Sequence, residues 1–197
     1  MNRRPFAALA IAVFFAILLV STCSSQEKDF GKAGTVEIAG SVSFSSITPV
    51  SHGRTGEATT LLSLGPEIGY FVADGFEIGF NPGISLIPGV SVITPSEGEG
   101  LTIMQLFAYP AYNFHTEGNP VSPFLQVPFG YTAMTSNDFT QSGFSWGVKG
   151  GLKVTIASHL LLTVYGQYLA MTFNPEGVTE RYGFNFLSFG VGVGGFF

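Results

Sequence analysis

Five charged residues could do chemistry in this protein, because each lies among small or polar residues on one face of a segment whose other face is apolar. They are Glu37, Glu67, Glu77, Lys149 and Lys153, called the charge network below. Charges that point into a protein interior must be paired, since an isolated buried charge is very costly. We therefore predict that these three carboxylates and two ammonium groups form structural ion pairs. The alternative is a path for ions along the same side chains.

Alternating hydrophobicity along the chain directs these charges to one face. Successive side chains of a strand point to opposite faces, so a hydrophobic pattern with a period of two predicts strands. Eight segments show this pattern in the same sense, with bulky apolar residues on one face and small or polar residues on the other. They span residues 36–45, 62–72, 76–86, 101–114, 121–132, 144–156, 160–168 and 183–197. The sequence therefore predicts an all-β protein.

The connections between these segments are short and long in turn. Short ones fall at 73–75, 115–119 and 157–159, and long ones at 48–59, 91–100, 135–141 and 174–182. This order describes an antiparallel up-and-down meander. Strands of about 10 residues cross a bilayer when tilted, and backbone polar groups in lipid must bond to one another. We therefore predict an eight-stranded transmembrane β-barrel whose first strand pairs with its eighth.

The composition favours a membrane barrel over a water-soluble domain. Charged residues are only 11% of the chain, against about 25% in ordinary soluble domains. Hydrophobic residues make up 46%, and glycine (26) and phenylalanine (20) are both abundant. Large side chains outside a barrel and small ones inside it require this combination. A soluble lipocalin-like carrier, the alternative, would need a far more charged exterior.

The N-terminus has the order of residues found in secretory signals. Arg3 and Arg4 precede an apolar run at 6–20, and small polar residues follow at 21–25. The run is shorter than the roughly 20 residues of a membrane-spanning helix. We predict a signal peptide at 1–25, cleaved after Ser25, then a short segment at 26–34 and the barrel at 35–197. An uncleaved anchor is the alternative.

The single cysteine and the charge balance limit the chemistry of the mature protein. Cys23 lies in the predicted cleavage zone, where it leaves with the signal or, in the alternative, is the lipidated cysteine of a lipoprotein. A disulfide within one chain is excluded. Loss of Arg3 and Arg4 would leave six basic residues against thirteen acidic ones, which disfavours a nucleic-acid partner. The sequence shows no metal-binding spacing and no phosphate-binding loop, so we predict no metal and no cofactor.

Three stretches give the chain a family resemblance. They are the terminal Phe197 with apolar residues at alternate positions before it, residues 70–75 (YFVADG), and residues 122–124 leading to 130–131. In these features the chain resembles the small OmpA/OmpX-like eight-stranded outer-membrane barrels of Gram-negative bacteria, with 70–75 like their second strand and turn and 122–131 like their fifth strand. The resemblance covers the whole mature chain.

The resemblance implies a location and a set of partners. The termini, the segment at 26–34 and the short turns would be periplasmic, and the long loops extracellular. Phe189, Val191, Val193 and Phe197 would form the signal that the barrel-assembly machinery reads. Other partners would be outer-membrane lipids including lipopolysaccharide, and the barrel would be a monomer. We expect a non-catalytic protein with a structural or surface-interaction role; a narrow channel for ions or small solutes is the alternative.

A lipid-modifying enzyme is a further alternative, since some eight-stranded barrels deacylate or acylate lipid A. Such deacylases use serine, histidine and an acidic residue, with the histidine as general base. His115 and His159 fall in short turns, so His52, beside Ser51 and near Glu57, is the remaining candidate. The His-x-Ser arrangement of those enzymes is absent, which disfavours catalysis. Other loop charges are solvated tips or, alternatively, an adhesion surface: Arg54, Glu97, Glu99, Asp138, Glu176, Glu180 and Arg181.

Five prolines interrupt the strand pattern. Pro66, Pro82, Pro110, Pro123 and Pro128 lie within predicted strands, and each removes a hydrogen-bond donor from the ladder. A closed barrel has no edge strand to hold them. We therefore expect bulges or strand ends at some of these prolines, and the least regular pairing in the fourth and fifth strands.

Overall fold

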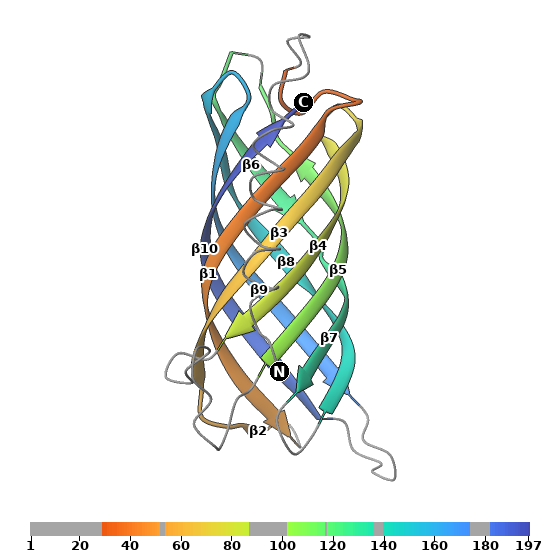
Figure 1. Ribbon diagram of the computed structural model, residues 1–197, viewed down its shortest axis with the longest axis vertical. Coiled ribbons are helices and arrows are strands. Elements are labelled where there is room, and N and C mark those ends of the chain that lie inside the picture. The colour runs from red at the N-terminus through yellow and green to blue at the C-terminus, as the bar shows by residue number, and fades with distance from the viewer. Residues whose placement is uncertain (1–28, 52–53, 87–101, 117, 136–139, 174–181) are drawn as a thin grey trace, which may run out of the picture.

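The protein is a closed cylinder of antiparallel strands, seen in a computed structural model that describes residues 29–51, 54–86, 102–116, 118–135, 140–173 and 182–197 (Figure 1). Within these residues the regular secondary structure is all β. The strands are β1 (Val36–Ser51), β2 (Arg54–Thr55), β3 (Thr59–Ala73), β4 (Phe76–Leu86), β5 (Thr102–Asn113), β6 (Val121–Gln126), β7 (Phe129–Thr135), β8 (Thr140–Ala157), β9 (Leu160–Phe173) and β10 (Tyr182–Phe196).

Nine of these ten elements make the wall of the barrel, as eight wall strands. β6 and β7 both pair with β5 and β8, so together they form one interrupted strand, and β2 pairs only with the end of β1. Each wall strand pairs with the next along the chain, and β10 pairs with β1 from Glu37–Phe196 to Ser51–Tyr182. The predicted eight-stranded up-and-down barrel, closed between its first and last strands, is confirmed.

The two faces of the wall differ as the alternation predicts. In β10, Phe189 is 64% exposed while its neighbour Ser188 is 5% exposed. The outward side chains form an apolar belt around the cylinder, and the inward ones are mostly small or polar. A bilayer requires this arrangement, because lipid solvates the outside while the inside must be filled by the protein itself.

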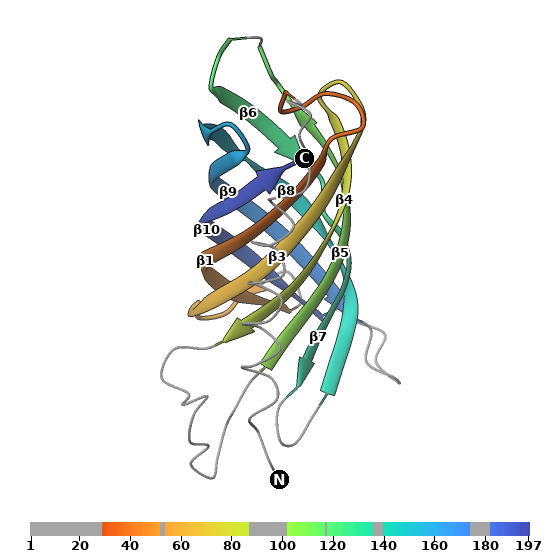
Figure 2. The ribbon, with the colours of Figure 1, turned by 45° about the horizontal axis from the view of Figure 1, so that its top comes forward.

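Several strands are longer than the hydrophobic pattern indicated. β1 continues to Ser51, whereas apolar residues alternate only as far as Phe44. Near the long connections the outward side chains become polar, for example Thr60, Thr102, Ser142 and Thr172. Backbone pairing continues there, but the hydrophobic period that signals a strand is lost. The wall therefore extends past the apolar belt at this end. We call it the long-loop end; it is the end where β4 ends and β5 begins (Figure 2).

The prolines are accommodated only partly as we expected. The pairing shifts lie between Phe71 and Ala73 and between Thr155 and Ala157, away from the prolines. β5 runs unbroken through Pro110, so the fourth strand is more regular than predicted. The fifth strand is broken at Pro128, as the sequence suggested. Four of the prolines fall on outward positions of their strands: Pro66, Pro82, Pro110 and Pro123.

Two apolar clusters close the interior at opposite ends. Near the short turns, called the short-turn end, Phe30 joins Phe71, Leu161 and Phe196. Toward the long-loop end a larger cluster contains Ile47, Leu61, Ile103, Phe107, Met134, Leu169, Met171 and Phe186. Among the described residues no helix is long and apolar enough to cross a membrane. The predicted signal peptide, with Cys23, lies outside the described residues.

Candidate functional site in the barrel interior

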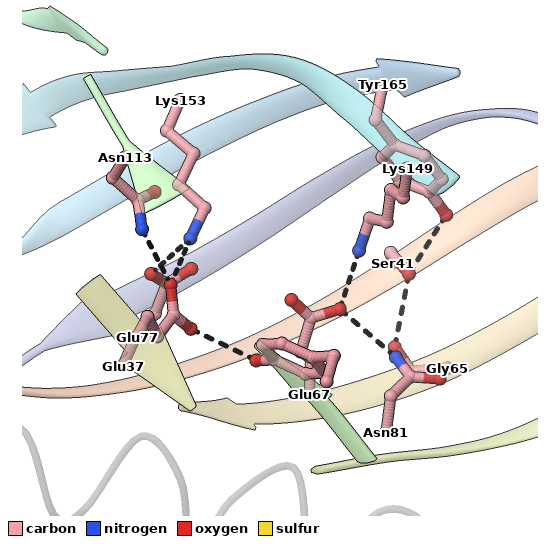
Figure 3. Close-up of polar contacts among 11 residues, drawn as sticks. Glu37, Ser41, Gly65, Glu67, Glu77, Asn81, Asn113, Lys149, Lys153 and Tyr165 are labelled. Atoms are coloured by element: carbon pink, nitrogen blue, oxygen red, sulfur yellow. Dashed lines mark hydrogen bonds and ion pairs between the residues drawn. The ribbon is translucent and has the colours of Figure 1, made fainter. Parts of the chain in front are cut away.

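Lys153 joins two of the predicted carboxylates between the apolar clusters. Its Nζ lies 2.6 Å from Oε2 of Glu37 and 3.1 Å from Oε2 of Glu77 (Figure 3). Glu77 also accepts hydrogen bonds from Tyr109 Oη at 3.0 Å and from Asn113 Nδ2 at 2.9 Å. Four strands, β1, β4, β5 and β8, therefore meet at one buried ammonium group.

Lys149, two inward positions before Lys153 on β8, holds the third carboxylate. Its Nζ lies 2.6 Å from Oε2 of Glu67, which also accepts a hydrogen bond from Asn81 Nδ2 at 3.2 Å. The spacing of four residues between Lys149 and Lys153 keeps both side chains on the inward face of β8. The structure thus brings all five predicted residues together as two neighbouring groups of ion pairs.

Aromatic rings surround the two ammonium groups. Lys153 Nζ lies 5.5 Å from the ring centroid of Phe30 and 5.3 Å from that of Phe124, and Lys149 Nζ lies 4.5 Å from that of Tyr165. Such rings attract a cation through their electron-rich faces. The five charged side chains are at most 8% exposed. Because both acceptor pairing and aromatic contacts are present, the lysine charges can remain buried.

The contacts of the two lysines suit a structural role for the charge network. Each ammonium group contacts carboxylate oxygens, so neither lysine is a free nucleophile or base of the kind that catalysis requires. In the part of the chain that the structure describes, no group of three or more histidine, cysteine or acidic side chains could hold a metal ion. The charges can, however, bind β8 to the opposite wall and fix the register of the strands that carry them.

The N-terminal hook, residues 29–35, closes the short-turn end next to Lys153. Phe30 is 3% exposed and meets the rings of Phe71 and Phe196 edge-on at 5.4 and 5.5 Å. The hook is bonded to the β3–β4 turn, since Gly75 N donates to Gly31 O at 2.7 Å. Gly31 has a φ of 84°, which favours glycine at this tight turn.

Asp74 anchors the same hook from the turn. Its carboxylate accepts hydrogen bonds from the Ala33 backbone N–H at 2.9 Å and from Lys32 Nζ at 3.3 Å. The Ala33 N–H, followed by Lys32, lowers the pKa of the Asp74 carboxyl below its usual value. The predicted segment at 26–34 is thus, from Asp29 onward, a folded part of the barrel end.

A small polar cavity of about 40 Å³ lies between the charge network and the apolar cluster of the long-loop end. Its lining includes Ser63, Asn81, Gln105, Lys149 and Tyr165. A space of this size holds roughly two or three waters. The cavity is therefore too small for an organic solute, and its polar lining suits water.

The histidines do not gather into a catalytic site in the described residues. His115 Nδ1 lies 3.1 Å from Ser122 Oγ, and its ring meets Phe30 edge-on. His159 packs against Phe196 and stacks on Phe197. His52 lies outside the described residues, so the structure does not test its proximity to Glu57.

The C-terminal strand is paired to its last residue. Phe197 N donates to Val36 O, and Val36 N donates to Phe197 O, both at 2.9 Å. Phe189, Val191 and Val193, the other residues of the predicted assembly signal, lie on the apolar belt and are each more than half exposed. These three residues thus lie where lipid can contact them, whereas Phe197 is partly buried and stacks on His159.

The uncharged members of the site were not among the predicted site residues. Three of them lie on inward faces of the alternating pattern: Tyr109, Asn113 and Asn81. Their inward position was the only sign in the sequence that they belong to the interior. Their partners could not be chosen, because register and stagger between strands decide which inward residues meet. Phe30 gave no signal, since it precedes the first alternating segment.

A closed cylinder with an apolar belt outside and paired charges inside defines a transmembrane β-barrel. The model of the outer membrane protein beta-barrel domain matches residues 15–197, so the chain belongs to that family and to the bacterial outer membrane. Among curated protein sequences none matches this chain.

Two solved structures illustrate the shared fold. The outer membrane protein OprG from Pseudomonas aeruginosa is 14% identical, with a TM-score of 0.56 over 84% of this chain and 97% of that chain. Neisserial surface protein A (NspA) is 14% identical, with a TM-score of 0.51 over 79% of this chain and 96% of that chain. At such identities the likeness supports the fold alone.

Proposed function

We propose that this protein is an integral outer-membrane scaffold with a structural or surface-interaction role and without catalytic activity. The observation that carries the proposal is the filling of the interior. Apolar side chains close both ends, and the charge network between them is paired. A barrel built in this way holds its long loops at one membrane face and gives solutes no continuous aqueous path.

Conductance across a planar bilayer tests this proposal against the channel alternative. The purified, refolded barrel should add no steps of current above the lipid background at either polarity. Phe76→Ala, a change on the apolar belt, should behave as the parent does, because it leaves the interior intact. Regular unitary steps from the parent protein would replace the scaffold with a narrow channel for ions or small solutes.

The lipid-modifying alternative has its own test. Mass spectrometry of lipid A from cells with and without the protein should give the same acyl composition. An acyl chain that is missing or added only when the protein carries His52 would overturn the interpretation that the protein is non-catalytic.

We further propose that both termini and the short turns face the periplasm and that the long loops are extracellular. The short-turn end carries the N-terminal hook and the final residue, as expected if both ends remain on the side from which the chain enters the membrane (Figure 1). Protease added to intact cells should cut within 87–101 or 174–181 and leave the hook uncut. Cleavage at the hook alone would reverse the orientation.

We also propose that outer-membrane lipids including lipopolysaccharide surround a monomeric barrel and that the assembly machinery reads its last strand. Phe197→Ala should lower the fraction of protein that becomes heat-modifiable in cells, while refolding of the same variant in detergent should change little. Equal losses in both settings would make Phe197 a stability residue and remove the assembly signal.

A further inference from the structure

Pro66 and Pro82 direct their backbone carbonyls at each other across β3 and β4. In an antiparallel pair the N–H and C=O of one residue point to the same neighbouring strand, and the direction alternates along the chain. Phe71 bonds toward β1, since its N–H donates to Thr35 O. Odd residues of β3 therefore point to β1 and even ones, including Pro66, point to β4.

The same reasoning fixes the direction of Pro82. Asn113 N donates to Gly75 O, so odd positions of β4 point to β5 and even positions point to β3. β3 and β4 pair as far as Leu64–Ile84 and pair again from Ile68–Phe80, and the unchanged register sets Pro66 opposite Pro82. The ladder is interrupted between these two pairs, and neither proline has an N–H to donate.

The remaining prolines of the wall keep a partner for their carbonyls. Pro110 O accepts from Val127 N at 3.0 Å, Pro123 O from Phe114 N at 2.8 Å and Pro128 O from Gly147 N at 2.9 Å. Each of these pairs loses one hydrogen bond of two and retains the other. The Pro66–Pro82 pair loses both, which leaves two carbonyls facing each other within the membrane-spanning part of the wall.

The polar cavity reaches this break from inside. Gly65 and Gly83, the inward neighbours of the two prolines, line the cavity with Asn81. A methyl group on Gly65 would lie 3.8 Å from Pro82 O and 3.5 Å from Asn81 Oδ1. The Pro82 carbonyl oxygen is therefore in contact with the part of the cavity next to Gly65. The same methyl group would lie 3.4 Å from Asn81 Nδ2, so this amide nitrogen is the polar donor nearest the break.

We propose that the facing carbonyls of Pro66 and Pro82 bind a hydrogen-bond donor, namely water drawn from the interior cavity. One water can donate to both carbonyl oxygens and accept from Asn81 Nδ2, which gives it three partners, within the two to four that buried water requires. A backbone carbonyl without a hydrogen-bond donor is costly in lipid, so hydration from within removes the main penalty of two opposed prolines. The wall between β3 and β4 is thereby held together at this level by water.

Water-edited solid-state NMR of the barrel in lipid bilayers tests the site. With ¹³C at the proline carbonyls, magnetisation from water should reach Pro66 and Pro82 several-fold faster than Pro110, whose carbonyl already has a backbone donor. Signals are assigned from Pro66→Val, Pro82→Val and Pro110→Val. Transfer to Pro66 and Pro82 that is no faster than transfer to Pro110 would overturn the proposal.

Two variants separate bound water from general exposure. Gly65→Ala adds a methyl group to the cavity at ordinary contact distances, so it should slow transfer to Pro66 and Pro82 and leave Pro110 unchanged. Pro82→Val returns an N–H to the ladder and should slow transfer to the Pro66 carbonyl. If the folded variants show the same transfer as the parent, the water does not occupy this break.

Discussion

Lys153 is the residue on which the buried charges of the barrel most depend. It is the shared partner of Glu37 and Glu77, and all three side chains are at most 3% exposed. Lys153→Met leaves two carboxylates buried beside an apolar group, and such a loss costs about 3–5 kcal/mol. The variant should lose its heat-modifiable, fast-migrating form on a gel at a markedly lower temperature than the parent.

Two comparisons test whether charge is the cause. Lys32→Met breaks a pair that is more than half exposed, so its transition should stay near that of the parent. Glu37→Gln and Glu77→Gln added to Lys153→Met remove the unpaired charges and should recover most of the loss. A triple variant no more stable than Lys153→Met alone would show that packing of the lysine stem, and not charge, holds the site.

Asp74 should make attachment of the N-terminal hook dependent on pH. Its carboxyl pKa is lowered in the folded protein, so its contribution is complete above the unfolded pKa and is lost as the pH falls through the folded value. Hydrogen exchange at Ala33 should therefore stay slow at neutral pH and accelerate only in acid below the usual carboxyl range. In the Asp74→Asn variant, the exchange rate of the Ala33 amide should follow only the intrinsic pH dependence of amide exchange across that acidic range.

At the scale of elements, the N-terminal hook should protect the interior from water at the short-turn end. Phe30→Ala removes the ring that contacts Phe71, Phe196 and His115 and leaves a gap beneath Lys153. A cysteine placed at the inward Thr163, with Cys23 replaced by serine, should then react with a water-soluble maleimide. With Phe30 in place it should react slowly, because Thr163 is only 7% exposed.

The matched control for this experiment is another phenylalanine on the opposite face of the wall. Phe76→Ala lies on the apolar belt and should leave the Thr163→Cys thiol protected. Fast labelling in the presence of Phe30 would mean that the hook does not close the barrel, and equal labelling in both alanine variants would point to general loosening.

The elements also show why proline was hard to interpret from the sequence. A proline's cost depends on the residue opposite it, so Pro110 keeps a bond with Val127 N whereas Pro66 meets Pro82. The sequence marks each missing donor but not the partner. Register across neighbouring strands decides whether one hydrogen bond or two are lost.

At the scale of the whole molecule, the barrel is apolar outside over most of its length and changes near the long-loop end. There, outward positions carry threonine and serine, while inward positions form the larger apolar cluster. Each end thus buries apolar side chains inside, and the charged layer lies between them. The membrane boundary at the long-loop end should follow the change from apolar to polar residues on the outer face.

Trp146 reports the membrane position of the whole barrel, because it is the only tryptophan and is 55% exposed on the outer face. In lipid vesicles its fluorescence should be blue-shifted and strongly quenched by lipids with brominated acyl chains. Trp146→Phe should remove the signal without loss of heat modifiability. Emission like that of tryptophan in water, from folded protein in vesicles, would contradict the assignment of this face to lipid.

The sequence by itself determined the fold class, the inward and outward faces and the residues of the charge network. A period of two is a local property of the chain, so each strand reveals its own faces without reference to a neighbour. The few strand charges on the polar face could be chosen as interior residues for the same reason, and the closure of the first strand on the last followed from the need to satisfy the backbone in lipid.

Only the tertiary structure decided which inward side chains contact one another inside the barrel. Lys153 reaches Glu37 and Glu77 while Lys149 reaches Glu67, because the stagger of the strands sets which inward positions share a level. The same stagger brings Phe30 under Lys153 and sets Pro66 against Pro82. These contacts join residues far apart in the chain, and alternation carries no information about the relative shift of two strands.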